Sequence, residues 1–338
     1  MHMSDALVSP AVGVSMLAVG GAALAYSAVK MRQQNVLEDK TVPVMGVMSA
    51  FVFAAQMINF TIPGTGSSGH IGGGILLAAL LGAYPGLISI SAVLLIQCLF
   101  YADGGLLALG CNLFNMGVLT CLVAYPLIFR PILKKGITKP RLMLASVLAA
   151  IFGLQLGAFS VVLETLASGV TSLPFGSFAL LMQPIHLAIG LVEGVVTGAI
   201  LIFVYQARPE LIRSVQNRVR LERAVPVRRV VIGLLIAAGL LAGGLSLFAS
   251  VYPDGLEWSV DKVAGGEPAN SGIAYRVADW IQSKTALMPD YSTGAASEAA
   301  STSGAGLIGG GIVLALAAGT AFLLSRVKRK TAEQQDAE

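Results

Sequence analysis

Charged residues, histidine and cysteine are all scarce in this chain of 338 residues. Only 12% of the residues are charged, about half the share found in an average soluble domain. Hydrophobic residues make up 55% of the chain, and the mean hydropathy is +0.78. This composition excludes a water-soluble domain and predicts an all-α polytopic membrane protein.

Motifs for catalysis and nucleotide binding are missing as well. The sequence contains no Gly-x-x-x-x-Gly-Lys-Ser/Thr loop for ATP phosphates and no His-Glu-x-x-His helix motif for zinc. Cys98, Cys111 and Cys121 lie in apolar stretches without Cys-x-x-Cys spacing, and we interpret them as small core residues. The chain is therefore predicted not to be an enzyme, and energy for any transport must come from partner subunits or from an ion gradient.

Apolar stretches that could cross a bilayer recur along the chain, each close to the roughly 20 residues that a spanning helix needs. Residues 71–101 are apolar throughout, but Tyr84-Pro85-Gly86 interrupts them and predicts two helices, about 71–83 and about 86–101. With these two, the sequence predicts nine transmembrane helices. The other seven are expected at about 12–29, 43–60, 106–129, 141–163, 178–205, 230–250 and 306–325.

Basic residues predict the orientation of these helices. Lysine and arginine gather in cytoplasmic loops, so the net charge of +4 is attributed to topology and no nucleic-acid partner is predicted. The N-terminus is then outside and the C-terminus cytoplasmic, with the 61–70 loop on the outer face. The residues used are Lys30, Arg32, Lys40, Arg130, Lys134, Lys135, Lys139, Arg141, Arg208, Arg213, Arg218, Arg220, Arg223, Arg228, Arg229, Arg326, Lys328, Arg329 and Lys330.

The chain is predicted to divide into three parts. Residues 1–207 form a seven-helix bundle, 208–229 a basic cytoplasmic linker, and 230–338 a region with two further transmembrane helices. The segment between those two helices is rich in Ala, Gly and Ser and is expected to be a poorly packed external loop. Within it, Pro253-Asp254-Gly255 would be an ordinary turn.

The first two residues can chelate a metal ion. The α-amine of Met1, the amide nitrogen between Met1 and His2, and Nδ1 of His2 can close a five-membered and a six-membered ring around one ion. These three coplanar nitrogens leave the fourth corner of a square free, and His70 is the candidate for it. Such a set suits Ni(II) or Cu(II) rather than tetrahedral zinc. The chelate requires that Met1 is retained, which the bulk of His2 favours; a chance Met-His pair is the alternative.

His70 ends an irregular loop of small and polar residues at 59–74. Irregular backbone at membrane depth persists only where it is buried in protein or lines a cavity, and the amides and hydroxyls of this loop could hold His70 in one tautomer. The alternative is a capping loop with an incidental histidine. Other polar residues in predicted spans are either functional or packing contacts between helices, and for His186 and Glu193 we favour packing. These residues are Gln97, Asn112, Asn115, His186 and Glu193.

The first predicted helix carries small residues at four-residue spacing. Ala18 and Ala22 form one such pair, and Gly21 and Ala25 form another. Small residues allow helices to approach closely. We favour packing within the bundle as their role; docking of a coupling protein is the alternative.

Several segments resemble one transporter family. They are Met1-His2, Asn59-Phe60 with the loop that ends in Gly69-His70, Asn112-Leu113-Phe114-Asn115-Met116, and His186-Leu187-Ala188-Ile189-Gly190-Leu191-Val192-Glu193-Gly194. Over residues 1–207 the chain is similar to the substrate-binding membrane component of nickel/cobalt energy-coupling-factor (ECF) transporters. In the C-terminal region, Pro253-Asp254-Gly255-Leu256-Glu257 resembles the signature of the PDGLE-type accessory component of such systems, fused here to the bundle.

This resemblance implies a metal site and partner subunits. It implies that Met1, His2 and His70 bind the transported Ni(II) or Co(II) in a square plane, with no permanently bound cofactor. It also implies a membrane coupling protein and two ATP-binding subunits, in the cytoplasmic membrane of a prokaryote. Nickel is favoured because the accessory component resembles that of nickel systems; import of cobalt for cobalamin synthesis is the alternative.

An ion-driven secondary transporter fits the residues less well. Such a protein would pair acidic with basic residues inside the membrane. Asp103, Glu164 and Glu193 have no basic partner within the predicted spans. The sequence therefore favours the ATP-driven importer.

Overall fold

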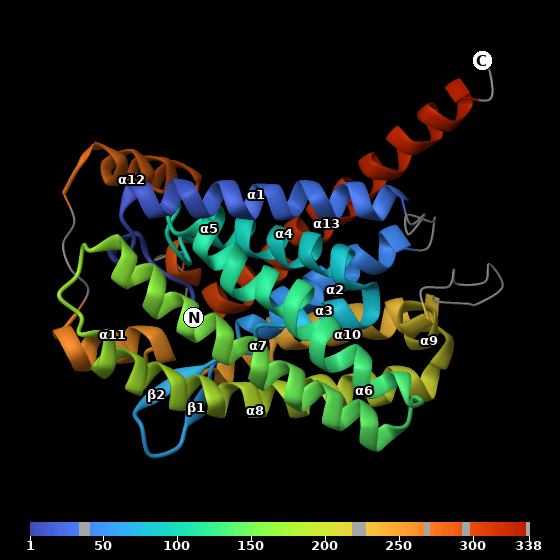
Figure 1. Ribbon diagram of the computed structural model, residues 1–338, viewed down its shortest axis with the longest axis horizontal. Coiled ribbons are helices and arrows are strands. Elements are labelled where there is room, and N and C mark those ends of the chain that lie inside the picture. Colours follow the sequence, from blue (N-terminus) through green and yellow to red (C-terminus); the bar gives the residue numbers. More distant parts are fainter. Residues whose placement is uncertain (34–40, 218–227, 267–270, 293–297, 336–338) are drawn as a thin grey trace.

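The computed structural model is a bundle of helices with one small β-hairpin (Figure 1). The structure describes residues 1–33, 41–217, 228–266, 271–292 and 298–335. Four of the basic residues used for the topology prediction lie outside the described residues: Lys40, Arg218, Arg220 and Arg223.

Six helices of the described part of the chain are long and apolar enough to cross a membrane. The all-α polytopic membrane fold predicted from composition is therefore confirmed. These helices are α1 (Pro10–Gln33), α4 (Ala83–Tyr101), the continuous helix Leu109–Lys134, α7 (Lys139–Ser168), α8 (Phe175–Ala207) and the stretch Ala300–Leu324 of α13 (Glu298–Gln335). The continuous helix consists of α5 (Leu109–Asn112), η2 (Leu113–Phe129), which is wound as a π-helix, and α6 (Arg130–Lys134).

Three further apolar helices are shorter: α2 (Thr41–Gln56), α3 (Gly74–Leu81) and α10 (Arg228–Gly243). All nine predicted segments overlap a helix of the structure. The eight residues of α3, however, rise only about 12 Å, too short to cross about 30 Å of hydrocarbon alone. The count of nine crossings and the orientation derived from it stay predictions.

The predicted break in the stretch 71–101 is present, but it lies at Gly82 rather than at Tyr84-Pro85-Gly86. Gly82 has a φ of +99° and separates α3 from α4, a conformation that glycine adopts at little cost. Pro85 is the third residue of α4. It is tolerated there because the first N–H groups of a helix have no intrahelical partner.

Several short elements complete the described chain. They are η1 (Asp5–Leu7), β1 (Phe60–Ile62), β2 (Ser67–Gly69), α9 (Pro209–Asn217), η3 (Leu245–Phe248), α11 (Gly255–Ala264), α12 (Ile273–Thr285) and η4 (Pro289–Tyr291). Strands β1 and β2 pair antiparallel, with Phe60 opposite Gly69.

The helices of the C-terminal region pack on the same bundle as the N-terminal helices. Both α10 and α13 lie against α2, and α7 lies along α8. Glycines allow this close packing: a Cβ at Gly309 of α13 would lie 2.3 Å from the ring of Phe53, and one at Gly194 of α8 would lie 2.4 Å from Cα of Val147. The result is one continuous apolar core that includes α2, α3 and α4.

Helix α1 lies on the outside of this bundle. Only 17% of the residues in its apolar stretch are buried, against 72% in α4. Ala18, Gly21, Ala22 and Ala25 are all exposed, and no atom lies within 4 Å of a Cβ placed at Gly21. The interpretation that these small residues pack the bundle is therefore wrong, because the inner face of α1 is formed by other residues.

The described residues between the last two apolar helices are folded, which corrects the expectation of a poorly packed loop. Helix α11 packs against α8 and β2, and α12 packs against α4. Pro253-Asp254-Gly255 is more than a turn, because Asp254 caps α11. Its Oδ1 accepts the N–H groups of Leu256 and Glu257 at 2.8 and 2.9 Å, and Glu257 accepts the N–H of Asp254 at 3.2 Å. This capping box fixes the start of the helix.

One end of the bundle gathers the elements that the sequence singled out. Figure 1 shows the N-terminus, the β1–β2 hairpin, α11 and α12 at this end, with α9 at the opposite end. The prediction that the first residues and the loop at 61–70 share one face is confirmed. Assignment of that face to the outside of the cell stays a prediction.

Candidate metal site

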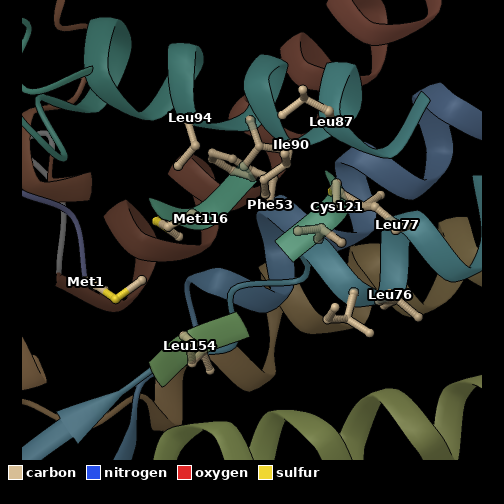
Figure 2. Packing of buried hydrophobic residues seen from close by; sticks show 14 of the residues in the cluster. Met1, Phe53, Leu76, Leu77, Leu87, Ile90, Leu94, Met116, Cys121 and Leu154 are labelled. Atoms are coloured by element: carbon tan, nitrogen blue, oxygen red, sulfur yellow. The ribbon is translucent and has the colours of Figure 1, made fainter. Parts of the chain in front are cut away.

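The amino group of Met1 lies at the centre of the candidate site. Met1 is 6% exposed and belongs to the buried hydrophobic cluster that also contains Met116 and Leu154 (Figure 2). A Cβ at Gly157 of α7 would lie 2.9 Å from Cε of Met1, so a glycine here leaves room for the side chain. The α-amine donates to Oδ2 of Asp254 at 2.5 Å. The first residue is thus anchored by its side chain and its charge.

His70 presents a lone pair to this amine. Its Nε2 lies 3.4 Å from the nitrogen of Met1, and its Nδ1 lies 3.1 Å from the carbonyl oxygen of Ile71. Because a carbonyl oxygen only accepts, Nδ1 carries the proton and Nε2 is left as the acceptor. Burial, followed by the nearby ammonium of Met1 and by His2, lowers the pKa of His70 to about 3. The imidazole is therefore neutral, which is the form that binds metals.

His2 stacks on His70, with ring centroids 5.1 Å apart. Nδ1 of His2 lies 3.3 Å from Oδ1 of Asp103, and Nε2 lies 3.2 Å from Oε1 of Gln97. Burial lowers the pKa of His2, and the opposing effect of Asp103 is smaller. In this structure Nδ1 faces Asp103, so the predicted chelate requires the imidazole to turn about its Cβ–Cγ bond.

Asn112 fixes the chain directly after the first two residues. Its Oδ1 accepts the N–H of Met3 at 2.7 Å, and its Nδ2 donates to the carbonyl oxygen of Met3 at 3.1 Å. The N–H of Gly105 also donates to that carbonyl, at 2.9 Å. Asn115, in contrast, donates to Glu164 at 2.7 Å, and its Nδ2 lies 3.8 Å from Sδ of Met3. Asn112 therefore has a positioning role at this site.

Glu193 of α8 fixes the turn that follows His70. Its two carboxylate oxygens accept the N–H groups of Gly72 and Gly73 at 2.8 and 3.0 Å. Gln56 donates to the carbonyl oxygen of Gly72 at 2.7 Å from the other side. Gly73 has a φ of +78°, and a Cβ there would lie 2.4 Å from Val52, so only glycine fits. Two helices thus hold this turn in one position.

Replacing Glu193 by alanine should destabilise the protein and weaken metal binding together. Two buried N–H groups would lose their acceptors, at about 2–6 kcal/mol in total. We expect nickel affinity to fall by about tenfold or more, because the support of a ligand is lost. Thermal melting and nickel titration of the purified protein would measure both effects.

The matched control for this variant is Glu164→Gln, which changes a buried glutamate that accepts from Asn115 and Ser160 instead. It should leave nickel affinity unchanged. An equal loss of affinity in the control, or normal affinity in Glu193→Ala, would contradict the positioning role of Glu193.

His186 lies beside this cluster, since a Cβ placed at Gly255 would lie 3.4 Å from its Cε1. Its Nδ1 donates to the carbonyl oxygen of Met182 at 2.8 Å, while its Nε2 is buried without a hydrogen-bond partner in the structure. In the described part of the chain, no three His, Cys, Asp or Glu side chains are arranged to hold a metal. A site here would have to combine His2 and His70 with main-chain nitrogens.

Sequence reasoning missed the contact of Asp254 with this site. Its motif had been noted, but the ion pair joins residues 253 positions apart, and no local pattern predicts it. Ser68 adjoins this contact, because its N–H and its hydroxyl donate to the carbonyl oxygens of Pro253 and Tyr252, both at 2.8 Å. Burial alone would raise the pKa of Asp254, but the Met1 ammonium outweighs it and holds that pKa well below its usual range.

The fold and the site define a polytopic helical membrane protein with a buried N-terminal amine beside two imidazoles. The family model described as cobalt uptake substrate-specific transmembrane region (CbiM) matches residues 2–211, and that of the PDGLE domain matches residues 228–326. The chain belongs to this CbiM family of nickel and cobalt transport proteins, with a PDGLE domain in the same chain. It is a metal transport component.

Named relatives extend over most of the chain. A putative fused nickel transport protein NikMN of Archaeoglobus fulgidus is 31% identical over 97% of this chain and 99% of its own length. The fused nickel transport protein NikMN of Rhodobacter capsulatus is 28% identical over 86% of this chain and 88% of its own. The cobalt transport protein CbiM of Geobacter sulfurreducens is 27% identical over 79% of this chain and 80% of its own length.

A solved structure is similar as well. The crystal structure of a truncated transition metal transporter matches with a TM-score of 0.54 and 30% identity, over 61% of this chain and 99% of that one. The resemblance predicted from the sequence motifs is thereby confirmed at the level of the family.

Proposed function

We propose that this chain captures Ni(II) for an ATP-driven ECF importer. The metal is held in a square plane by the α-amine of Met1, the amide nitrogen between Met1 and His2, and the imidazoles of His2 and His70. One observation carries this proposal: the buried amine lies 3.4 Å from Nε2 of His70, on which the ring of His2 stacks.

The donors suit this chemistry. His70 supplies a lone pair without first losing a proton, since its pKa is lowered to about 3. Coordination replaces one proton on the amine and one on the amide. The metal thereby takes the place of the ion pair between Met1 and Asp254. His2 completes the plane when its ring turns and brings Nδ1 to the metal.

Nickel is the favoured substrate, and Co(II) is the second candidate. Nitrogen donors bind Ni(II) more tightly than Co(II). The relatives matched over 97% and 86% of this chain are named nickel transport proteins, and a cobalt-named relative is matched over 79%. The family model itself is described by cobalt uptake, which is the observation that favours cobalt.

Energy would come from partner subunits in the cytoplasmic membrane of a prokaryote. The sequence has no phosphate-binding loop for ATP, so two ATP-binding subunits and a membrane coupling protein are proposed. The small residues Ala18, Gly21, Ala22 and Ala25 on the exposed face of α1 would allow a helix of the coupling protein to approach closely.

Uptake assays would test the proposed energy source. Cells that express this chain with the coupling and ATP-binding subunits should accumulate nickel, whereas an ATPase-inactive variant of those subunits should reduce uptake to background. Uptake by this chain alone that a proton uncoupler abolishes would instead identify an ion-driven transporter. Parallel assays with Co(II) would rank the two metals.

A further inference from the structure

We propose that the PDGLE domain forms part of the metal site, because Tyr291 orients the imidazole of His2 through Asp103. The inference rests on the proposed function, in which His2 is a metal ligand. The hydroxyl of Tyr291 donates to Oδ2 of Asp103 at 2.5 Å, and Oδ1 of the same carboxylate lies 3.3 Å from Nδ1 of His2. Tyr291 is thus a positioning residue that acts through Asp103.

The ring of Tyr291 is itself firmly held. It stacks on Tyr101 of α4 with centroids 4.7 Å apart, and its centroid lies 6.5 Å from that of Phe53. Asp290 and Tyr291 both have positive φ values, +49° and +59°. Residues other than glycine adopt this backbone conformation only at a cost in free energy. The surrounding packing offsets that cost and directs the hydroxyl at Asp103.

Helix α12 holds the loop that carries Asp103. Nε2 of Gln282 donates to the carbonyl oxygens of Cys98 and Gly104 at 3.0 and 2.9 Å. Cys98 lies in the last turn of α4, where carbonyl oxygens have no partner within the helix, and Gly104 directly follows Asp103. One side chain of the PDGLE domain therefore connects the end of α4 with the residue that follows Asp103.

The chain between α12 and Tyr291 makes a second attachment. The N–H groups of Leu287 and Met288 donate to the carbonyl oxygen of Phe100, at 2.9 and 3.1 Å. Phe100 also belongs to the last turn of α4. The PDGLE domain thus fixes the backbone around Asp103 through Gln282, Leu287 and Met288. It fixes the Asp103 carboxylate through Tyr291.

This support suits both orientations of His2. A half turn of the ring exchanges Nδ1 with Cδ2 and Nε2 with Cε1. At present the two ring nitrogens lie beside Oδ1 of Asp103 and Oε1 of Gln97. After the half turn, Nε2 points between these two oxygens, and Nδ1 lies at the opposite edge of the ring. A histidine that binds a metal through one nitrogen keeps its other N–H on such an acceptor.

The hydroxyl of Tyr291 remains a hydrogen-bond donor at ordinary pH. Burial, followed by the charge of Asp103, raises the pKa of Tyr291 well above its usual value. The hydroxyl therefore stays protonated and donates to the carboxylate. With Oδ2 taken by the Tyr291 hydroxyl, Oδ1 of Asp103 is left to accept a ring N–H of His2, from Nδ1 as the ring lies now and from Nε2 after the half turn.

Nickel binding by Tyr291→Phe, compared with Tyr101→Phe, tests this inference in the full-length protein. Each variant removes one hydroxyl from the same pair of stacked rings, but the hydroxyl of Tyr101 donates to the carbonyl oxygen of Ala305. We expect Tyr291→Phe to lower nickel affinity about tenfold, in the range found for supports of metal ligands. The visible absorption band of its nickel complex should shift or broaden, because the His2 ring is no longer held in one orientation. Tyr101→Phe should change neither quantity.

Unchanged affinity and spectrum in Tyr291→Phe would overturn the inference, and so would equal changes in Tyr101→Phe. If Tyr291→Phe does not fold, Asp103→Asn replaces it and should show the same loss. The proposed function fails separately, when nickel affinity survives a residue added before Met1. If that added residue abolishes binding while Tyr291→Phe binds normally, only the role of Tyr291 is refuted.

Discussion

Nickel binding should fall by more than about 100-fold when one glycine is added before Met1. The addition converts a basic amine into an amide and removes the proposed ligand, which Asp254 now holds at 2.5 Å. It also forces an extra residue into a site where Met1 is only 6% exposed. Loss of an outer support costs about 10–100-fold in metal affinity, and loss of a ligand should cost more.

Calorimetric titration with Ni(II) and Co(II) would measure this effect on native and extended protein. The intact mass of the native protein checks that Met1 is retained. His70→Gln is the companion variant, because it leaves the terminus intact and should lose binding to the same extent. Unchanged one-to-one binding by the extended protein would move the site elsewhere. His186, with its unpartnered Nε2, would be tested next.

The metal-free protein should lose about 3 kcal/mol of stability on Asp254→Asn. Removing one partner of a buried ion pair leaves the other charge uncompensated, which typically costs 3–5 kcal/mol. Asparagine caps a helix as well as aspartate does, so this variant separates the charge from the cap of α11. Asp254→Ala should cost about 1 kcal/mol more, because it removes the cap as well.

The contribution of this ion pair should disappear in acid. The folded pKa of Asp254 lies below its ordinary value of 3.8, so the contribution is fully present above that value and declines as the pH falls through the lower, folded pKa. Thermal melting of the metal-free protein from about pH 5 to about pH 2 should therefore show a steeper loss for the native protein than for Asp254→Asn. If melting temperature falls with pH equally in the native protein and in Asp254→Asn, the stabilising role of the ion pair between Met1 and Asp254 is contradicted. Glu257→Gln, which keeps the ion pair between Met1 and Asp254 and changes the acceptor of the Asp254 N–H, is the control and should follow the native curve.

The sequence allowed the local half of the site to be predicted. Met1 and His2 are adjacent, so their chelating atoms are fixed by covalent geometry, and His70 stood out because only three histidines are present. The supports are distant: Asp254 and Tyr291 lie 253 and 188 positions from their partners Met1 and Asp103. No spacing rule predicts such pairs, because they form only when separate helices pack together.

The same contrast applies to the fold. Apolar composition by itself determined a helical membrane protein, because backbone groups in lipid must be hydrogen-bonded within their own segment. Tertiary structure decided that α11 and α12 fold over the N-terminus, that the small residues of α1 remain exposed, and that the ring of His2 faces Asp103. These outcomes depend on which surfaces bury one another and on which charges are paired away from water. Contacts between residues far apart in the chain leave no periodic signal in the sequence.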